Sequence, residues 1–204
     1  MARAPKARLT PWLGPGVLIG SLVPLALLVA SALRGRLGAD PVAIALNQLG
    51  LLALIFLLAS LAMSPIRILF GVPWPGRIRR MLGLLAFFYA SLHVGVYVVV
   101  DQQVALRAIL EDIAERPFIT VGFAAYVLLI PLALTSTQGT IRRLGGPRWR
   151  MLHRLAYVAA ILAIFHFVWR VKSDLGQPIA YAMVLFALFA VRIRKVLYRR
   201  FAAR

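Results

Sequence analysis

Long apolar runs separated by short clusters of charged residues make up most of the chain. Each run is about as long as the roughly 20 residues that an α-helix needs to cross a bilayer. The pattern predicts six membrane-spanning helices, at residues 13–33, 43–63, 81–100, 117–135, 151–170 and 175–191. The first run is longer than the apolar core of a typical signal peptide, so we expect a retained helix. The expected fold is an all-α, six-helix transmembrane bundle that forms one domain, residues 1–204.

The composition supports a membrane protein and excludes several other classes. Hydrophobic residues make up 62% of the chain and charged residues 15%, whereas soluble domains are about half apolar and a quarter charged. A water-soluble domain of this size cannot bury such an excess, and a disordered chain would not carry it. There is no cysteine, which excludes disulfides, thiolate iron–sulfur clusters, thiolate zinc sites and c-type haem attachment.

The net charge of +18 sets the orientation of the helices in the membrane. The positive residues lie in clusters between the apolar runs, so we expect contact with membrane lipid and no nucleic-acid partner. The tails and loops on one side of the predicted membrane sum to +17, and those on the other side sum to zero. Because positive loops stay in the cytoplasm, both termini are predicted to be cytoplasmic. The expected location is the bacterial inner membrane.

The candidate chemistry lies in three histidines, His93, His153 and His166. All three fall within predicted membrane helices, where ionisable residues are costly and often functional. His93 lies 13 residues, or about 20 Å, beyond Arg80 at the cytoplasmic end of its helix. His166 lies at a similar depth on a parallel helix, and His153 lies near the cytoplasmic face. His93 and His166 are therefore expected to face each other in the outer half of the membrane.

Two histidines at one depth on different helices are the ligand set of a six-coordinate b-type haem. We predict that His93 and His166 are its axial ligands; with both axial positions filled, such a haem carries electrons. A zinc site between them would lack further ligands. Small residues precede both histidines at helical spacing and leave room for a flat ring: Ala86, Ala90, Ala159 and Ala163.

The role of His153 stays open among several interpretations. It can face a flavin or a quinone, bind a second haem with an unidentified ligand, or bond a lipid headgroup or helix end. Arg142, Arg143 and Arg148 surround two glycines nearby, and they can hold a phosphate such as that of FMN or contact anionic lipid. No dinucleotide-binding motif is present, so electrons must come from a partner or a membrane-soluble donor.

Three segments carry a resemblance to a known family: RRMLGLLAFFYASLHVGVY (79–97), DIAERPFITVGFAAYVLLIPLALTST (112–137) and RRLGGPRWRMLHRLAYVAAILAIFHFVW (142–169). They resemble the MsrQ (YedZ) family, haem-binding membrane subunits of the bacterial periplasmic methionine sulfoxide reductase system, within the ferric-reductase-like transmembrane superfamily. Its three histidines match His93, His153 and His166. The resemblance implies haem b, FMN, and electron delivery from quinol to a periplasmic subunit that contains a molybdenum cofactor.

The predicted function is that of an electron-transfer subunit of an oxidoreductase complex rather than its catalytic subunit. Electrons would pass from a donor near the cytoplasmic face, through the outer haem, to the periplasmic reductase that repairs oxidised methionine. Two alternatives stay open. One is a stand-alone ferric or quinone reductase membrane domain, and the other is a non-redox transporter or scaffold with structural histidines.

Overall fold

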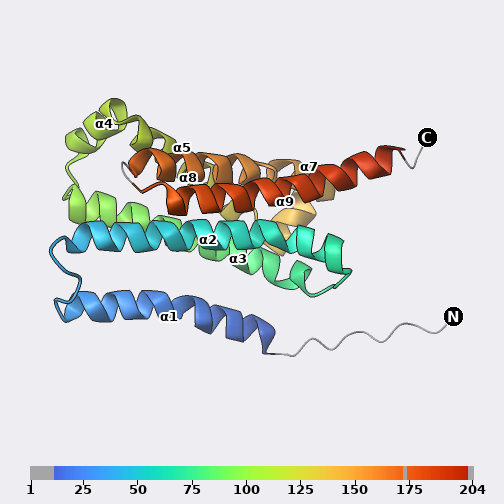
Figure 1. The fold of residues 1–204 in the computed structure, drawn as a ribbon, viewed down its shortest axis with the longest axis horizontal. Coiled ribbons are helices and arrows are strands. Elements are labelled where there is room, and N and C mark those ends of the chain that lie inside the picture. The colour runs from blue at the N-terminus through green and yellow to red at the C-terminus, as the bar shows by residue number, and fades with distance from the viewer. Residues whose placement is uncertain (1–11, 172–173, 202–204) are drawn as a thin grey trace. The chain divides into compact units, whose positions relative to one another are not determined.

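The computed structural model describes residues 12–171 and 174–201, which contain helices and turns but no β-strand. The fold class is therefore all-α, as predicted. Some charges of the topology argument, including those of Arg3, Lys6, Arg8, Lys172 and Arg204, lie outside the described residues. In chain order the helices are α1 (Leu13–Leu33), α2 (Pro41–Phe70), α3 (Pro75–Val96), the π-helix η1 (Tyr97–Asp101), α4 (Leu106–Glu115), α5 (Pro117–Leu134), α6 (Gln138–Leu144), α7 (Gly146–Leu152), α8 (Leu155–Arg170) and α9 (Gly176–Phe201) (Figure 1).

Five helical segments of the described chain are long and apolar enough to cross a membrane. They are Leu13–Leu33, Pro41–Phe70, Pro75–Asp101, Pro117–Leu134 and Gly146–Arg170, and they match the first five predicted spans. The sixth predicted span lies within α9, and its crossing of the membrane stays a prediction. The chain divides into residues 1–41, which contain α1, and residues 42–204, which contain the other helices and every site described below.

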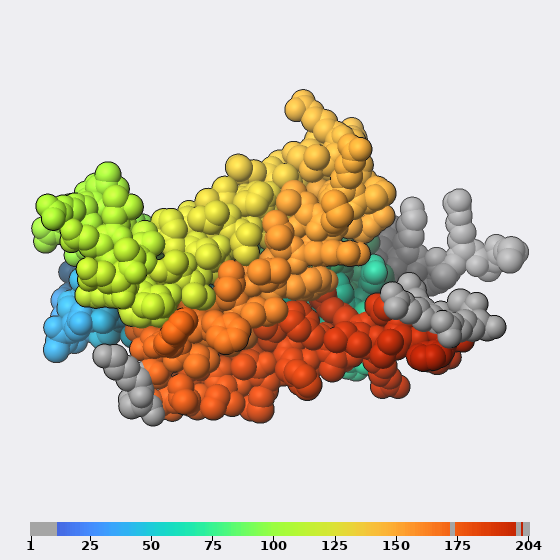
Figure 2. All heavy atoms as spheres, turned by 90° about the horizontal axis from the view of Figure 1, so that it is seen from above, coloured from blue at the N-terminus to red at the C-terminus, as the bar shows by residue number. Residues whose placement is uncertain are grey.

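Several segments that were expected to be loops form short helices. The segment between the third and fourth predicted spans contains α4. Its apolar residues recur at the spacing that makes one face of a helix apolar: Leu106, Ile109, Leu110 and Ile113. The segment after the fourth predicted span contains α6 and α7, which are separated by Gly145 at a φ of 74°. Figure 2 shows α4 and the α6–α7 pair at opposite ends of the face formed by α5, α8 and α9.

The fifth predicted span is not one continuous α-helix. α7 ends at Leu152, His153 and Arg154 form a turn, and α8 begins at Leu155. The third predicted span also changes its form, because α3 continues into the π-helix η1 after Val96. The residues from His153 to His166 therefore do not form one regular α-helix.

The core of residues 42–204 is built on close helix packing. α5 and α8 pack along much of their length, and Ala159 and Ala160 of α8 are fully buried. Small residues let membrane helices approach closely where large apolar side chains would hold them apart. α2 and α3 are joined by the stacked rings of Phe56 and Tyr89, whose centroids are 5.3 Å apart. This packing fixes the four helices that surround the site.

Candidate functional site

A cavity of about 300 Å³ lies among α2, α3, α5 and α8. This volume is within the range of small-molecule sites in proteins, about 300–1,000 Å³. Most of the lining is apolar, including Leu54, Leu57, Leu129 and Ala159. His93 and His166 are the two histidines among the residues that line the cavity.

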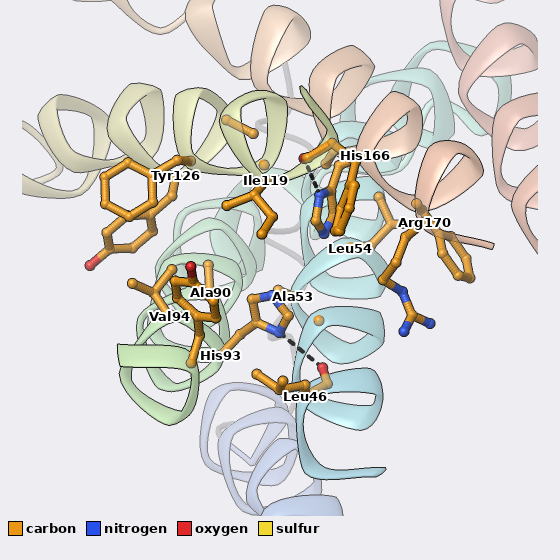
Figure 3. A pocket seen from close by; sticks show the side chains of 18 of the residues that line it. Leu46, Ala53, Leu54, Ala90, His93, Val94, Ile119, Tyr126, His166 and Arg170 are labelled. Carbon is orange, nitrogen blue, oxygen red and sulfur yellow. Dashed lines mark hydrogen bonds between the residues drawn. The ribbon is translucent and has the colours of Figure 1, made fainter. Parts of the chain in front are cut away.

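His93 of α3 and His166 of α8 lie across the cavity from each other, as the depth argument predicted. Their ring centroids are 6.2 Å apart, and their planes differ by 81°. Figure 3 shows the two imidazoles pointing toward one another from opposite walls. Helices far apart in the sequence thus bring two imidazole rings to one place.

Backbone carbonyl groups hold both rings from behind. His93 Nδ1 lies 2.9 Å from the carbonyl oxygen of Leu46 on α2, and His166 Nδ1 lies 2.7 Å from that of Phe118 on α5. A carbonyl oxygen only accepts hydrogen bonds, so each Nδ1 must carry the proton and donate it. Each neutral imidazole then keeps its Nε2 lone pair for a metal, as in many metal sites where a second partner orients the ligand.

Two glycines make these hydrogen bonds possible. Each stands four residues after the accepting carbonyl, Gly50 after Leu46 and Gly122 after Phe118. A Cβ atom at Gly122 would lie only 2.6 Å from His166 Nδ1, and one at Gly50 would lie 3.1 Å from His93 Nδ1. The absent side chains leave the space that each imidazole occupies against its neighbouring helix. Sequence reasoning missed both glycines.

The geometry fits a six-coordinate haem. Two imidazoles that hold one metal from opposite sides by bonds of about 2 Å have centroids roughly 6 Å apart, which is close to the 6.2 Å observed. Neither Nε2 atom has a hydrogen-bond partner among the described residues, and the surroundings are mostly apolar, as a porphyrin ring requires. Among the described residues, no cluster of three or more His, Asp or Glu side chains is placed to hold a metal ion instead.

Four alanines were expected to leave room for a flat ring beside the histidines, and three of them lie at the cavity. Ala90, Ala159 and Ala163 line the cavity. Ala86 does not line the cavity; it is fully buried among the core residues. Its small size serves helix packing rather than the space for a ring.

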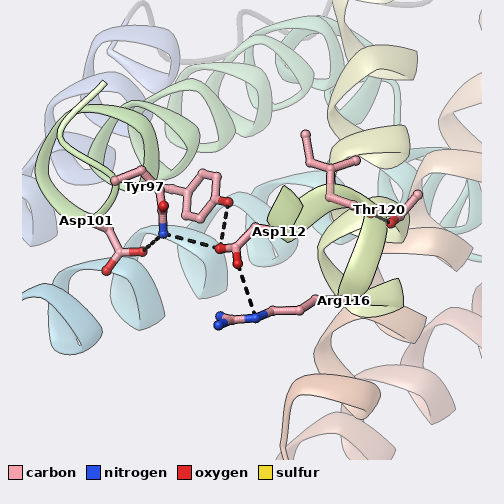
Figure 4. A network of polar contacts seen from close by, with 7 residues as sticks. Tyr97, Asp101, Asp112, Arg116 and Thr120 are labelled. Carbon is pink, nitrogen blue, oxygen red and sulfur yellow. Dashed lines mark hydrogen bonds and ion pairs between the residues drawn. The ribbon is translucent and has the colours of Figure 1, made fainter. Parts of the chain in front are cut away.

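The end of the cavity next to α4 is polar. Tyr97, Asp101, Arg116 and Arg170 line it. Tyr97 donates a hydrogen bond to Asp112 over 3.1 Å, and Arg116 Nε lies 3.2 Å from the other carboxylate oxygen of Asp112 (Figure 4). The sequence analysis did not predict these residues as part of the site, because the sequence alone does not show which polar residues near helix ends face a cavity.

His153 lies apart from this cavity and does not line it. Its ring stacks on Trp149, with centroids 3.9 Å apart, and its Nε2 lies 3.2 Å from Thr135 Oγ1. Trp149 in turn donates to the carbonyl oxygen of Thr135 over 2.9 Å. These contacts tie α7 to the end of α5. Arg142, Arg143 and Arg148, the predicted phosphate cluster, are all exposed on α6 and α7.

Comparison with known proteins identifies related membrane proteins. Residues 44–164 match the model of a family described as the ferric reductase like transmembrane component. A protein of Deinococcus radiodurans named protein-methionine-sulfoxide reductase heme-binding subunit MsrQ is 52% identical to the chain over 194 residues, which cover 95% of each sequence. The chain belongs to the MsrQ family.

Other MsrQ proteins are similar to this chain over most of its length. The one from Rhodospirillum rubrum is 48% identical and covers 92% of the chain and 90% of its own sequence. The one from Ralstonia nicotianae is 46% identical, with 85% and 81% covered. The family assignment predicted from three sequence segments is confirmed, and with it a multi-pass membrane protein.

Proposed function

We propose that this MsrQ-family chain binds haem b between His93 and His166 and serves as an electron-transfer subunit in the membrane. The observation that carries the proposal is the pair of facing imidazoles, 6.2 Å apart, whose Nδ1 atoms are both occupied by backbone carbonyls. The relatives carry the words heme-binding subunit in their names, which supports the same cofactor.

The two histidines determine what the site can do. Bound haem supplies one-electron transfer between ferric and ferrous iron. His93 and His166 would hold the haem iron from opposite sides, and the bound group would then carry electrons rather than bind oxygen or a substrate. The backbone bonds at Leu46 and Phe118 hold both rings in place through a change of iron charge. This arrangement favours an electron carrier over a catalytic subunit.

The partner is proposed to be a periplasmic molybdenum-dependent reductase that repairs oxidised methionine in proteins. The names of the relatives support a subunit of a methionine sulfoxide reductase system. The charge difference of 17 against zero supports six spans in the inner membrane, with both termini and the α6–α7 loop in the cytoplasm. The α4 loop would then lie outside, next to the polar end of the cavity. The position of α4 and α6–α7 at opposite ends of the bundle supports this alternation (Figure 2).

Electrons are proposed to enter from quinol near His153. The Trp149–His153 stack and the Thr135 hydroxyl offer an aromatic face and polar groups at the end of the bundle opposite α4. Neutral imidazole can accept a proton as quinol is oxidised. FMN, which the resemblance implies as a second cofactor, stays a prediction; its proposed phosphate site is the exposed cluster of Arg142, Arg143 and Arg148.

The absorbance spectrum of the purified protein tests this function. We expect a Soret band that shifts on reduction with dithionite, and faster reduction by a quinol than by NADH. A stand-alone ferric reductase would instead pass electrons to ferric chelates without a partner. A protein purified without any haem band would indicate a non-redox scaffold and contradict the proposal.

A further inference from the structure

The cavity is amphipathic, and its two ends differ in chemistry. Leu57 and Leu129 lie toward the apolar end, whereas the end near α4 carries Tyr97, Asp101, Arg116 and Arg170. Tyr97 follows His93 by four residues, and Arg170 follows His166 by four. Four residues of helix rise about 6 Å, so the polar end begins one turn beyond the imidazoles on both helices.

Among the described residues that line this end, Arg170 is the cation that no carboxylate neutralises. No described Asp or Glu lies within ion-pair distance of it; the ion pairs of the described residues are Arg107–Glu111 and Arg116–Asp112. It stands at the rim of the cavity and reaches across toward α2 (Figure 3). A guanidinium at the rim of an apolar cavity, with no acceptor for its donors among the described residues, is suited to an anionic group inside.

Arg116 is held in place by its neighbours. Its Nε pairs with Asp112 Oδ1 at 3.2 Å, while Asp112 Oδ2 accepts bonds from Tyr97 and from Gln102. The network leaves the two terminal amino groups of Arg116 for another acceptor (Figure 4). Asp101 is occupied in the same way, since it accepts a bond from Gln102 over 3.0 Å.

We propose that Arg170 and Arg116 bind the two propionate groups of the haem. The inference rests on the proposed function and adds the orientation of the cofactor to it. Haem joins an apolar ring to two carboxylates on one edge, and the cavity joins an apolar end to two arginines at one edge. Arginine binds carboxylates by paired, charge-assisted hydrogen bonds, whereas the leucine-lined end would leave a carboxylate without partners.

The two arginines are not equivalent. Asp112 already neutralises Arg116, and Asp101 adds a negative charge to the same end. Arg170 therefore supplies the charge that offsets the propionates, and Arg116 supplies hydrogen bonds in a fixed direction. The propionate edge then faces α4, which would be the side where electrons leave toward a partner.

A comparison of native haem with its dimethyl ester tests the proposal, since the ester has the same ring without carboxylates. The purified full-length protein is stripped of haem and reconstituted with either form, and the rate of haem loss to excess apomyoglobin is measured. Arg170→Gln should speed the loss of native haem about tenfold or more, the scale of one charge-assisted hydrogen bond, and should change the loss of the ester less than about twofold. Arg170→Lys should restore much of the retention.

The control is Arg107→Gln, which removes an equal charge near the same end of the bundle. Arg107 is exposed, pairs with Glu111 and does not line the cavity, so neither haem should be lost faster. An equal effect of Arg170→Gln on both haems would overturn the proposal and indicate a lipid headgroup or a packing role, and no effect on either would overturn it as well. Wild-type protein without a low-spin haem spectrum would contradict the proposed function itself.

Discussion

Replacing Gly122 by alanine tests whether the close approach of α5 to His166 positions the ligand. The new Cβ would lie 2.6 Å from Nδ1, 2.9 Å from Cε1 and 3.0 Å from Cγ of His166. Three atoms of the ring are too close at once, so rotation of the ring does not relieve the clash. The imidazole must withdraw by about 0.8 Å to reach the 3.4 Å at which ordinary contacts begin.

That withdrawal costs the hydrogen bond to Phe118, which is 2.7 Å long in the wild type. The lost bond is worth about 0.5–1.5 kcal/mol, and an off-rotamer side chain costs a similar amount. Together they predict about 1–3 kcal/mol against haem binding, consistent with the roughly 10- to 100-fold loss of metal affinity that follows removal of a ligand's outer partner. Alanine favours a helix over glycine by up to about 1 kcal/mol, which offsets part of this cost in the stability of the haem-free protein.

The assay is a haem titration of the purified variant, read from the Soret band, beside a thermal melt of the haem-free protein. Gly50→Ala should give a smaller loss, because its Cβ would lie 3.1 Å from His93 Nδ1. Gly95→Ala on α3 is the matched control, since nothing lies within 4 Å of its Cβ position. Wild-type haem affinity in Gly122→Ala would refute the reasoning, as would a loss of equal size in Gly95→Ala.

The remaining predictions concern orientation, electron entry and space. A reporter fused after Arg204 should be active in the cytoplasm, because the charge asymmetry retains the C-terminus there; periplasmic activity would reverse the electron path. His153→Ala should slow haem reduction by quinol in stopped-flow measurements and leave the spectrum of the outer haem intact, whereas equal rates would remove His153 from the path. Ala163→Leu should abolish most haem incorporation, since Ala163 lines the cavity and overpacking costs about 1–3 kcal/mol. Val158→Leu, at an outward-facing position of α8, should bind haem normally. Normal haem binding by both variants would contradict the assignment of the cavity as the haem site.

The sequence was sufficient for features that follow from composition and depth. Apolar runs of about 20 residues predict spanning helices, because that length of helix crosses the hydrocarbon core of a bilayer. Counting residues from charged ends placed His93 and His166 at one level, and the structure brings their rings together. Both inferences need only the regular rise of a helix, and that rise is the same in every fold.

Features that depend on which helices are in contact could not be predicted from the sequence. Gly50 and Gly122 acquire meaning only when α2 lies against α3 and α5 lies against α8, since each glycine makes room for a ring from another helix. Arg170 resembles any arginine at a helix end until the cavity is known. The turn at His153 gave no sequence signal, because no proline or glycine interrupts the run from 148 to 170.

Electron paramagnetic resonance of the oxidised protein tests most directly whether His93 and His166 hold one iron between them. We expect a low-spin ferric signal, of the strongly anisotropic form that follows from axial imidazole planes near 81° to each other. His93→Ala and His166→Ala should each convert it to a high-spin signal, while His153→Ala should preserve it. A low-spin signal that survives in either of the first two variants would contradict the shared iron.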